Sequence, residues 1–287
     1  MNNLPPDLRS WPYRLGVSPG DTVQLMADLT RLALLFRRAG AVFHPSDLLD
    51  AFAEAVGPTG NVLVPTYTFD LEEGDAFDVR RSGSISGVLA AAALAHPRFV
   101  RTPHPLHSFA VCGANAAELA ASAERGSFGP VSPFAFLRAH KARLIAIDLR
   151  LDDALTYVHH VEQCVGVPYR RQRVLRLAYI DAQGAAGPRE FSIYAKKPGH
   201  HMRFGGLERS LQETGAAGVL PLDGTKALVV DLPAAHAVIE GDIRANAARG
   251  IHEFRWSWWT RDVLKGLLRT FGIRRGKART SHAAGPR

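Results

Sequence analysis

The stretch Gly57-Pro-Thr-Gly-Asn-Val-Leu-Val-Pro-Thr-Tyr-Thr-Phe-Asp70 joins a turn, a short apolar strand and a polar loop in direct succession. Residues 57–60 are turn formers, and the apolar run 61–65 has the length of a buried strand. Upstream, residues 22–27 have strand character, and residues 47–56 place apolar side chains on one helical face, with Ser46 as the expected N-cap. This order of strand, helix and strand predicts a layered α/β fold.

The alternation continues along the chain. Ser84 is the expected cap of a helix at 85–95, and the apolar strands at 109–112 and 144–147 are each followed by a helical segment. We therefore expect a central sheet, largely parallel or mixed, flanked by helices. Ligands of such sheets favour the loops that follow the carboxyl ends of the strands.

The pattern changes after Arg170. Segments 174–179 and 190–195 flank Asp181-Ala-Gln-Gly and predict a small antiparallel hairpin, inserted at about 172–198. A helix at 207–214, a strand at 227–231 and a helix at 234–248 should follow. We expect a single domain at 1–250 and a basic, Trp-rich C-terminal helix and tail at 251–287.

Composition narrows the class of protein. The chain has 287 residues, 46% hydrophobic and 22% charged, which is ordinary for a globular protein. The two cysteines, Cys112 and Cys164, lie far apart, which argues against a disulfide scaffold or a cysteine zinc site. The sequence has neither an apolar run long enough to span a membrane nor a signal-peptide pattern at its start. The expected location is the cytoplasm.

The net charge of +8 comes largely from the tail. Residues 251–287 hold nine Lys and Arg residues against only Glu253 and Asp262. The body is close to neutral, and because nucleic-acid affinity depends on many phosphate contacts, we expect no nucleic-acid partner.

One polar cluster contains a pair suited to proton transfer. If residues 155–163 are helical, His159 and Glu162 lie at i and i+3 on the same face. The carboxylate would fix the imidazole tautomer and raise the basicity of the other nitrogen, so that it could deprotonate an alkylammonium group. The same spacing also fits an ordinary surface ion pair.

Five ordered motifs carry a resemblance to a known family: Gly57 to Asp70, Phe77 to Gly87, Arg101-Thr-Pro-His-Pro-Leu-His-Ser108, Phe128-Gly-Pro-Val-Ser-Pro133 and Thr156 to Glu162. In this order and spacing they resemble the aminoglycoside 3-N-acetyltransferases. The resemblance runs from about residue 20 to about residue 243. It implies an α/β fold in which acetyl-CoA, or another acyl-CoA, meets an amino sugar without a metal.

The resemblance also implies roles for individual residues. His159 matches the family's base, and Glu162 and Asp70 match the acidic positions near it. The positions that match the coenzyme side are Thr66, Thr68, Ser84, Ser108, Phe128 and Gly129. The residues expected on the substrate side are His104, His107 and Glu208. The implied mechanism is direct transfer, in which the amine attacks the thioester and backbone amides stabilise the oxyanion.

The chain also departs from the family's pattern. Many drug-modifying members have His-Ser-Ser-Leu after the first strand, where this chain has Met26-Ala-Asp-Leu29. The stretch from Val158 to Arg170 looks more like relatives associated with surface polysaccharides. We therefore expect an amino sugar as the substrate class, with aminoglycosides as candidates.

The sequence is also compatible with two other functions and with two interpretations of the C-terminal tail. A metal-dependent hydrolase could use His104, His107, His159, His160, Asp148, Asp152 and Asp153, although no His-Glu-x-x-His pattern is present. A catalytically inactive, sugar-binding family member is the other rival. The tail predicts either an interfacial helix on anionic lipid, at the inner face of the membrane, or a helix packed on the body or on a partner subunit.

Overall fold

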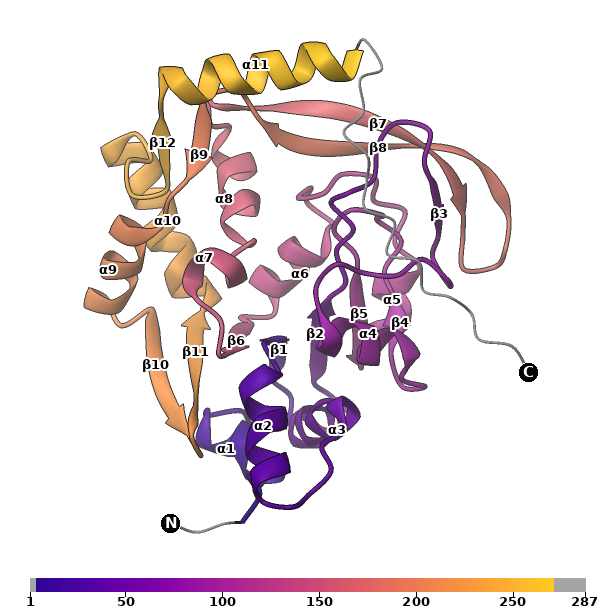
Figure 1. Cartoon of the computed structure of the whole chain (residues 1–287), viewed down its shortest axis with the longest axis vertical. Coiled ribbons are helices and arrows are strands. Elements are labelled where there is room, and N and C mark those ends of the chain that lie inside the picture. Colours follow the sequence, from indigo (N-terminus) through magenta and orange to yellow (C-terminus); the bar gives the residue numbers. More distant parts are fainter. Residues whose placement is uncertain (1–3, 271–287) are drawn as a thin grey trace.

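The computed structural model describes residues 4–270, and its centre is a seven-stranded sheet (Figure 1). The strand order is β10-β11-β6-β1-β2-β5-β4. The strands are β1 (Thr22–Ala27), β2 (Asn61–Pro65), β4 (Val100–Arg101), β5 (Phe109–Gly113), β6 (Arg143–Ile147), β10 (Ala217–Leu222) and β11 (Thr225–Asp231). Within this sheet β1 runs parallel to β2 and β6, and the outer pairs are antiparallel. The sheet is mixed, as expected, and the largely parallel alternative is wrong.

Both faces of the sheet are buried. Along β6, Leu144 and Ala146 pack into one core while Ile145 and Ile147 pack into the other, because successive strand residues point to opposite faces. The second of these cores holds η1 (Leu8–Ser10), α1 (Trp11–Arg14), α2 (Thr30–Arg38), α3 (Pro45–Val56) and α4 (Val88–Ala95). The first holds α5 (Ala116–Ala120), α6 (Pro133–Ala139), α7 (Leu151–Ala154), α8 (Val158–Val165), α9 (Gly205–Glu213) and α10 (Leu232–Asn246). The helices thus cover the sheet on both sides, as an α/β layered fold requires.

Two expected helix caps are wrong. Helix α3 begins at Pro45 with His44 as its N-cap, because proline at the first helical position lacks only an N–H that would be unsatisfied anyway. Helix α4 begins after Gly87, whose φ of 90° the glycine tolerates. Ser84 instead donates to the carbonyl of Tyr67 at 3.0 Å, so it holds a loop and does not cap a helix.

The predicted hairpin is present and belongs to a second sheet. It consists of β7 (Arg170–Ile180) and β8 (Ala186–Lys196), and β3 (Ala76–Asp78) adds to β7 in parallel. Phe77, Tyr179 and Phe191 are central to a small core of its own. The strand at β3 was not expected, because three residues carry too little pattern to show pairing with a distant segment.

The C-terminal segment packs on the body. Strand β12 (His252–Phe254) pairs with β9 (His200–Met202), and α11 (Trp256–Thr270) follows. Figure 1 shows α11 along one outer edge of the molecule, next to the β7–β8 hairpin. None of the helices in residues 4–270 is both long and apolar enough to cross a bilayer.

Candidate active site

A cavity of about 710 Å³ opens at the carboxyl ends of the three parallel strands β2, β1 and β6. This is the place where sheets of this kind bind ligands. The lining residues are Leu25, Met26, Ala27, Asp28, Leu29, Thr30, Ala33, Phe43, Pro45, Val64, Pro65, Tyr67, Phe69, Ile85, Ser86, Gly87, Val88, Leu89, Ala90, Leu149, Asp153 and Thr156. Most of these side chains are apolar. Residues 26–29, where the sequence differs from the family's pattern, are all part of this lining.

The charge of the lining is negative. Asp28 and Asp153 supply two carboxylates, and no Lys, Arg or His is among the lining residues of the described chain. Hydrogen bonds from Thr30 lower the pKa of the Asp28 carboxyl, so it is ionised at neutral pH. An apolar cavity with two acidic groups suits a ligand that carries ammonium groups. Sequence reasoning gave neither carboxylate a place in the acyltransferase site.

The expected histidine and carboxylate pair is present on α8. His159 Nδ1 lies 2.7 Å from Glu162 Oε2, and the Glu162 side chain is completely buried. The helix ends at Gly166 in the left-handed region, and the chain turns back so that Tyr169 and Arg170 reach the same carboxylate. Tyr169 donates to Oε1 at 2.8 Å, and Arg170 Nε lies 2.5 Å from Oε2.

Tyr169 and Arg170 were quoted in the sequence motif but were given no role. The signal that could have found them is their position, seven and eight residues after a carboxylate that is followed by a turn. Their side chains, with those of His159 and Glu162, form the Glu162 network.

The charges of this network determine its protonation. Burial raises the pKa of Glu162, but the hydrogen bond with His159 and the positive charge of Arg170 outweigh it and hold the pKa below its usual value. Burial lowers the pKa of His159, Glu162 raises it as expected, and Arg170 lowers it. Burial and Arg170 together outweigh Glu162, so the net pKa is below its usual value. His159 is neutral at pH 7, the state that a general base requires.

The hydrogen bond to Glu162 fixes the tautomer of His159. Because the carboxylate accepts, Nδ1 carries the proton and Nε2 keeps its lone pair. Arg170 Nη2 lies 3.3 Å from Nε2 and 2.8 Å from Nδ1, so the guanidinium sits against the imidazole ring. An incoming amine has to approach Nε2 beside this guanidinium.

His159 lies next to the cavity and does not line it. Thr156, which lines the cavity, accepts a hydrogen bond from the His159 amide at 3.1 Å. The His159 side chain is 19% exposed. The rings of Tyr67, Phe69 and Phe128 lie 5.5, 5.1 and 4.6 Å from that of His107, and Phe128 lies 5.6 Å from His159. Tyr67 and Phe69 line the cavity, and ring contacts through His107 and Phe128 connect this lining to the imidazole.

Two of the expected coenzyme contacts belong to a second buried cluster, the Arg101 network. Thr66 Oγ1 and Ser108 Oγ are 2.9 Å apart, and both side chains are fully buried. Arg101 donates to Ser108 Oγ at 3.0 Å and to the carbonyls of Thr66, Ser82 and Gly83. Within the described chain these hydroxyls have protein partners, and their contact with an acyl-CoA stays a prediction.

The other coenzyme positions lie in loops that surround these networks. Thr68 donates to the carbonyl of Pro105. Phe128 is buried against His159, and its carbonyl accepts from His160 Nδ1 at 3.0 Å. The carbonyl of Gly129 accepts from Ser132, the residue that caps α6. These loops are therefore held by internal hydrogen bonds.

The residues expected on the substrate side differ in exposure. His104 and His107 are only 4% and 8% exposed, and His104 Nδ1 accepts from the His107 amide at 3.2 Å. Burial lowers the pKa of His104 to about 4 and that of His107 well below its usual value. Glu208 lies on α9 near Arg150. Asp70, which was expected near the base His159, is exposed one residue after Phe69. Their roles stay predictions.

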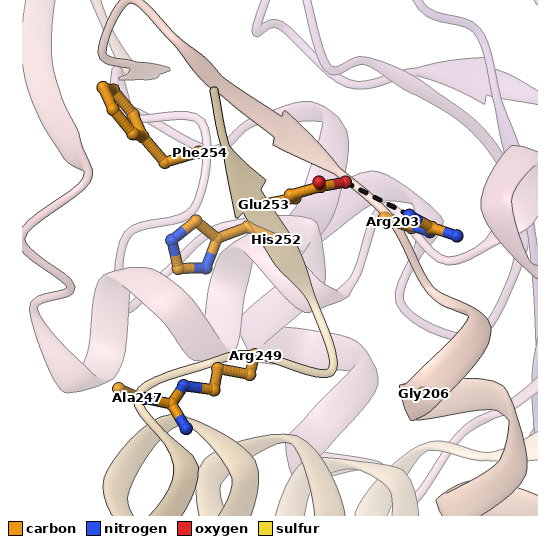
Figure 2. A pocket seen from close by; sticks show the side chains of 7 residues that line it. All are labelled: Arg203, Gly206, Ala247, Arg249, His252, Glu253 and Phe254. Atoms are coloured by element: carbon orange, nitrogen blue, oxygen red, sulfur yellow. Dashed lines mark hydrogen bonds and ion pairs between the residues drawn. The ribbon is translucent and has the colours of Figure 1, made fainter. Parts of the chain in front are cut away.

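A second cavity, of about 520 Å³, is lined by Arg203, Gly206, Ala247, Arg249, His252, Glu253 and Phe254 (Figure 2). His252 in its wall stacks on the Tyr169 ring with centroids 3.8 Å apart, and Arg203 pairs with Glu253 at 3.2 Å. His252 belongs to β12, so the C-terminal segment packs on the Tyr169 ring, whose hydroxyl donates to Glu162.

The ligand set of the rival hydrolase does not come together. Within residues 4–270 no three His, Cys, Asp or Glu side chains lie close enough to share a metal ion. His160 bonds to Phe128, and Asp152 pairs with Arg150 at 2.6 Å. The hydrolase alternative therefore lacks a site in the part of the chain that the structure describes.

Comparisons with known proteins agree with this fold and identify the family. A family described as aminoglycoside 3-N-acetyltransferase matches residues 36–241. The chain is 31% identical over 177 residues to aminoglycoside N(3)-acetyltransferase VII of Streptomyces paromomycinus, covering 55% of this chain and 59% of that protein. It is 30% identical to aminoglycoside N(3)-acetyltransferase IX of Micromonospora chalcea, covering 55% and 60%. The chain thus spans about 60% of the length of these curated relatives.

Solved structures show the same architecture. The aminoglycoside acetyltransferase AAC(3)-Xa superposes with a TM-score of 0.68 at 25% identity, covering 82% of this chain and 90% of that one. AAC-IIIb in a binary complex with CoASH gives a TM-score of 0.69 at 22% identity, covering 83% and 95%. The chain belongs to the aminoglycoside 3-N-acetyltransferase family.

Proposed function

We propose that this protein transfers an acyl group, most simply acetyl, from coenzyme A to an amino group of an amino sugar or aminoglycoside. The observation that carries the proposal is a neutral imidazole held by a buried carboxylate, beside a cavity that contains two further carboxylates. An amine substrate is protonated at neutral pH, with a pKa near ~10, and needs a base before it can attack.

The proposed reaction begins with proton transfer. His159 Nε2 takes a proton from the substrate ammonium, and the imidazolium that forms is stabilised by the Glu162 carboxylate. The amine lone pair then forms a C–N bond to the thioester carbonyl. The C–S bond breaks, the thiolate leaves, and the imidazolium returns its proton to the thiolate. The amide nitrogen loses its second proton to water, so the products are the amide, free thiol and one proton.

The cavity suits the two substrates in different ways. Its apolar walls fit a pantetheine arm, and Asp28 and Asp153 fit ammonium groups of an acceptor. The lining holds no basic side chain among the described residues, so the coenzyme phosphates would lie outside it. The solved relatives include one with CoASH and one, AAC-VIa, bound to sisomicin, which supports both substrate classes.

In this proposal the residues that follow β1 in the cavity lining determine the acceptor class. Met26, Ala27 and Asp28 replace the histidine and serines found there in many drug-modifying relatives, and Asp28 adds a negative charge. We propose an amino sugar in general, nucleotide-linked or polymer-linked sugars included, with aminoglycosides as candidates. An inactive sugar-binding protein would also need the cavity, but sugar binding alone would not require a neutral imidazole beside it.

The test is a thiol-release assay of the full chain with acetyl-CoA against a panel of aminoglycosides and nucleotide-linked amino sugars. We expect release with at least one acceptor and a product that is heavier by one acetyl group. Thermal shift with acetyl-CoA runs in parallel, because a bound ligand stabilises the fold. Stabilisation without thiol release from any acceptor would indicate the inactive binder, and the absence of both would overturn the proposal.

A further inference from the structure

Among its described side chains, helix α11 contacts the body through Trp258 and Asp262. The Trp258 ring lies 4.3 Å from that of His201, and Asp262 accepts from the amide of Gly199 at 3.2 Å. Asp262 also lies 3.5 Å from His201 Nε2. These contacts place residues 258 and 262 on the side that faces the body.

The opposite side of α11 is apolar and exposed. At 3.6 residues per turn, Trp256 and Leu264 lie roughly 120–160° around the helix from residues 258 and 262. Trp256 is 71% exposed and Leu264 is 58% exposed. Phe254 and Trp259 are each 39% exposed, and their rings lie 5.3 and 5.9 Å from that of Trp256. Phe254 and Trp259 also pack against Gly199 of the body, so they form the edge of this surface. We call Trp256 and Leu264, with Phe254 and Trp259 at their edge, the aromatic face.

An amphipathic helix usually turns its apolar face toward the core, because burial of that face stabilises the helix. Here Trp258 and Asp262 hold α11 to the body, whereas Trp256 and Leu264 are on the opposite side and exposed. Among the large apolar side chains of the described chain, Trp256 is one of the most exposed. A cluster of this kind marks a surface for a further contact.

The charge around the aromatic face is positive. Arg255 and Arg261 are about half exposed, at 49% and 47%. Arg261 lies between Trp258 and Leu264 around the helix, and Arg255 lies over the Trp258 ring. The two acidic residues of the segment are already paired, since Glu253 contacts Arg203 and Arg255, and Asp262 contacts His201. Residues 251–287 carry nine Lys and Arg residues in all.

We propose that the aromatic face is a docking surface for an anionic phospholipid bilayer. Tryptophan favours the boundary between lipid headgroups and acyl chains, and arginine beside it pairs with anionic headgroups. A second copy of the chain fits less well, because a symmetric contact would bring two strongly basic segments together. Since no described helix is able to cross a bilayer, the contact is peripheral.

The test is sedimentation of the full chain with vesicles of phosphatidylcholine alone and of phosphatidylcholine mixed with phosphatidylserine. We expect binding to the mixed vesicles, weakened by high salt. The double variant Trp256→Ser/Leu264→Ser should reduce binding by about tenfold or more. The control is Tyr13→Ser, because Tyr13 is also exposed, at 60%, but lies on α1 at the far end of the molecule (Figure 1).

Vesicle binding is measured without acyl transfer, so the membrane proposal holds or fails independently of the proposed activity. Equal binding of the double variant and the wild type, or no binding at low salt, would overturn the proposal. Analytical ultracentrifugation supplies the other outcome. A dimer that dissociates in the double variant would show that the face meets a second copy, and would also overturn it.

Discussion

The Arg101 network and the Glu162 network each bury an arginine, and each arginine is 8% exposed. Arg101 donates to neutral groups, namely three carbonyls and the Ser108 hydroxyl, and burial lowers its pKa to about 10. Arg170 pairs with a carboxylate that also binds an imidazole. The Thr66 and Ser108 side chains of the first network are fully buried, whereas the second network includes the His159 side chain, which is 19% exposed.

This difference separates two roles within one set of sequence motifs. The Arg101 network joins the loops that follow β2 and precede β5, and its hydrogen bonds hold these loops together. For the Glu162 network we propose that the Nε2 lone pair of His159 serves proton transfer. Sequence similarity alone does not distinguish the two sets of residues. The structure does, because the hydrogen bonds of Arg101 end on neutral protein groups, whereas those of Glu162 include the His159 imidazole.

The largest expected effect comes from Arg101→Met. The change removes the guanidinium that joins the buried Ser108 hydroxyl to the carbonyls of Thr66, Ser82 and Gly83, which should cost about 3–5 kcal/mol of unfolding free energy. Urea unfolding measures it. Arg98→Met is the matched control, because Arg98 is 46% exposed and its pair with Asp50 should contribute about 1 kcal/mol or less. If Arg101→Met loses as little unfolding free energy as the control, the Arg101 network does not stabilise the fold.

The second effect is the pH dependence of stability. His104 is neutral in the folded protein because burial lowers its pKa to about 4, whereas an unfolded histidine has a pKa of 6.5. The unfolded state therefore binds the proton first, and stability falls as the pH drops from 6.5 toward 4. The loss from His104 alone is about 3 kcal/mol. Urea unfolding across this window checks it, and a flat profile would show that His104 is not enclosed.

The third and smallest effect tests the positioning role of Tyr169. Tyr169→Phe removes one donor to Glu162 and should reduce kcat/KM about tenfold, mostly in kcat, at a stability cost of about 1 kcal/mol. Tyr194→Phe is the control, because its hydroxyl donates to the carbonyl of Val167 at 3.2 Å and leaves Glu162 alone. If both variants lose the same activity, the effect is structural and Tyr169 does not position the carboxylate.

Much of the fold was predictable because local patterns agree with it. The strands at β1, β2, β5 and β6 are short apolar runs, and the helical spacing of residues 159 and 162 places both side chains together. The caps were not predictable in this way. Ser46 and Ser84 both fit a cap by type, but Pro45 and Gly87 determine where the helices begin.

The chemistry of the site was only half predictable. The sequence shows that Glu162 can reach His159, but the sign of the pKa change depends on burial and on Arg170, which returns through a turn at Gly166. In the same way, nothing local shows that the Thr66 and Ser108 hydroxyls face each other across the sheet edge. Both facts depend on tertiary contacts between segments far apart in the chain.

The central claim is that Nε2 of His159 takes the proton from the substrate amine. Its most direct test is kcat/KM for acetyl transfer as a function of pH, in the wild type and in His159→Ala. We predict an acid limb below pH 6.5 in the wild type, since the pKa of His159 is lowered, and a loss of about 10²-fold or more in the variant together with that limb. Full activity in a folded His159→Ala variant, with the acid limb intact, would contradict the account.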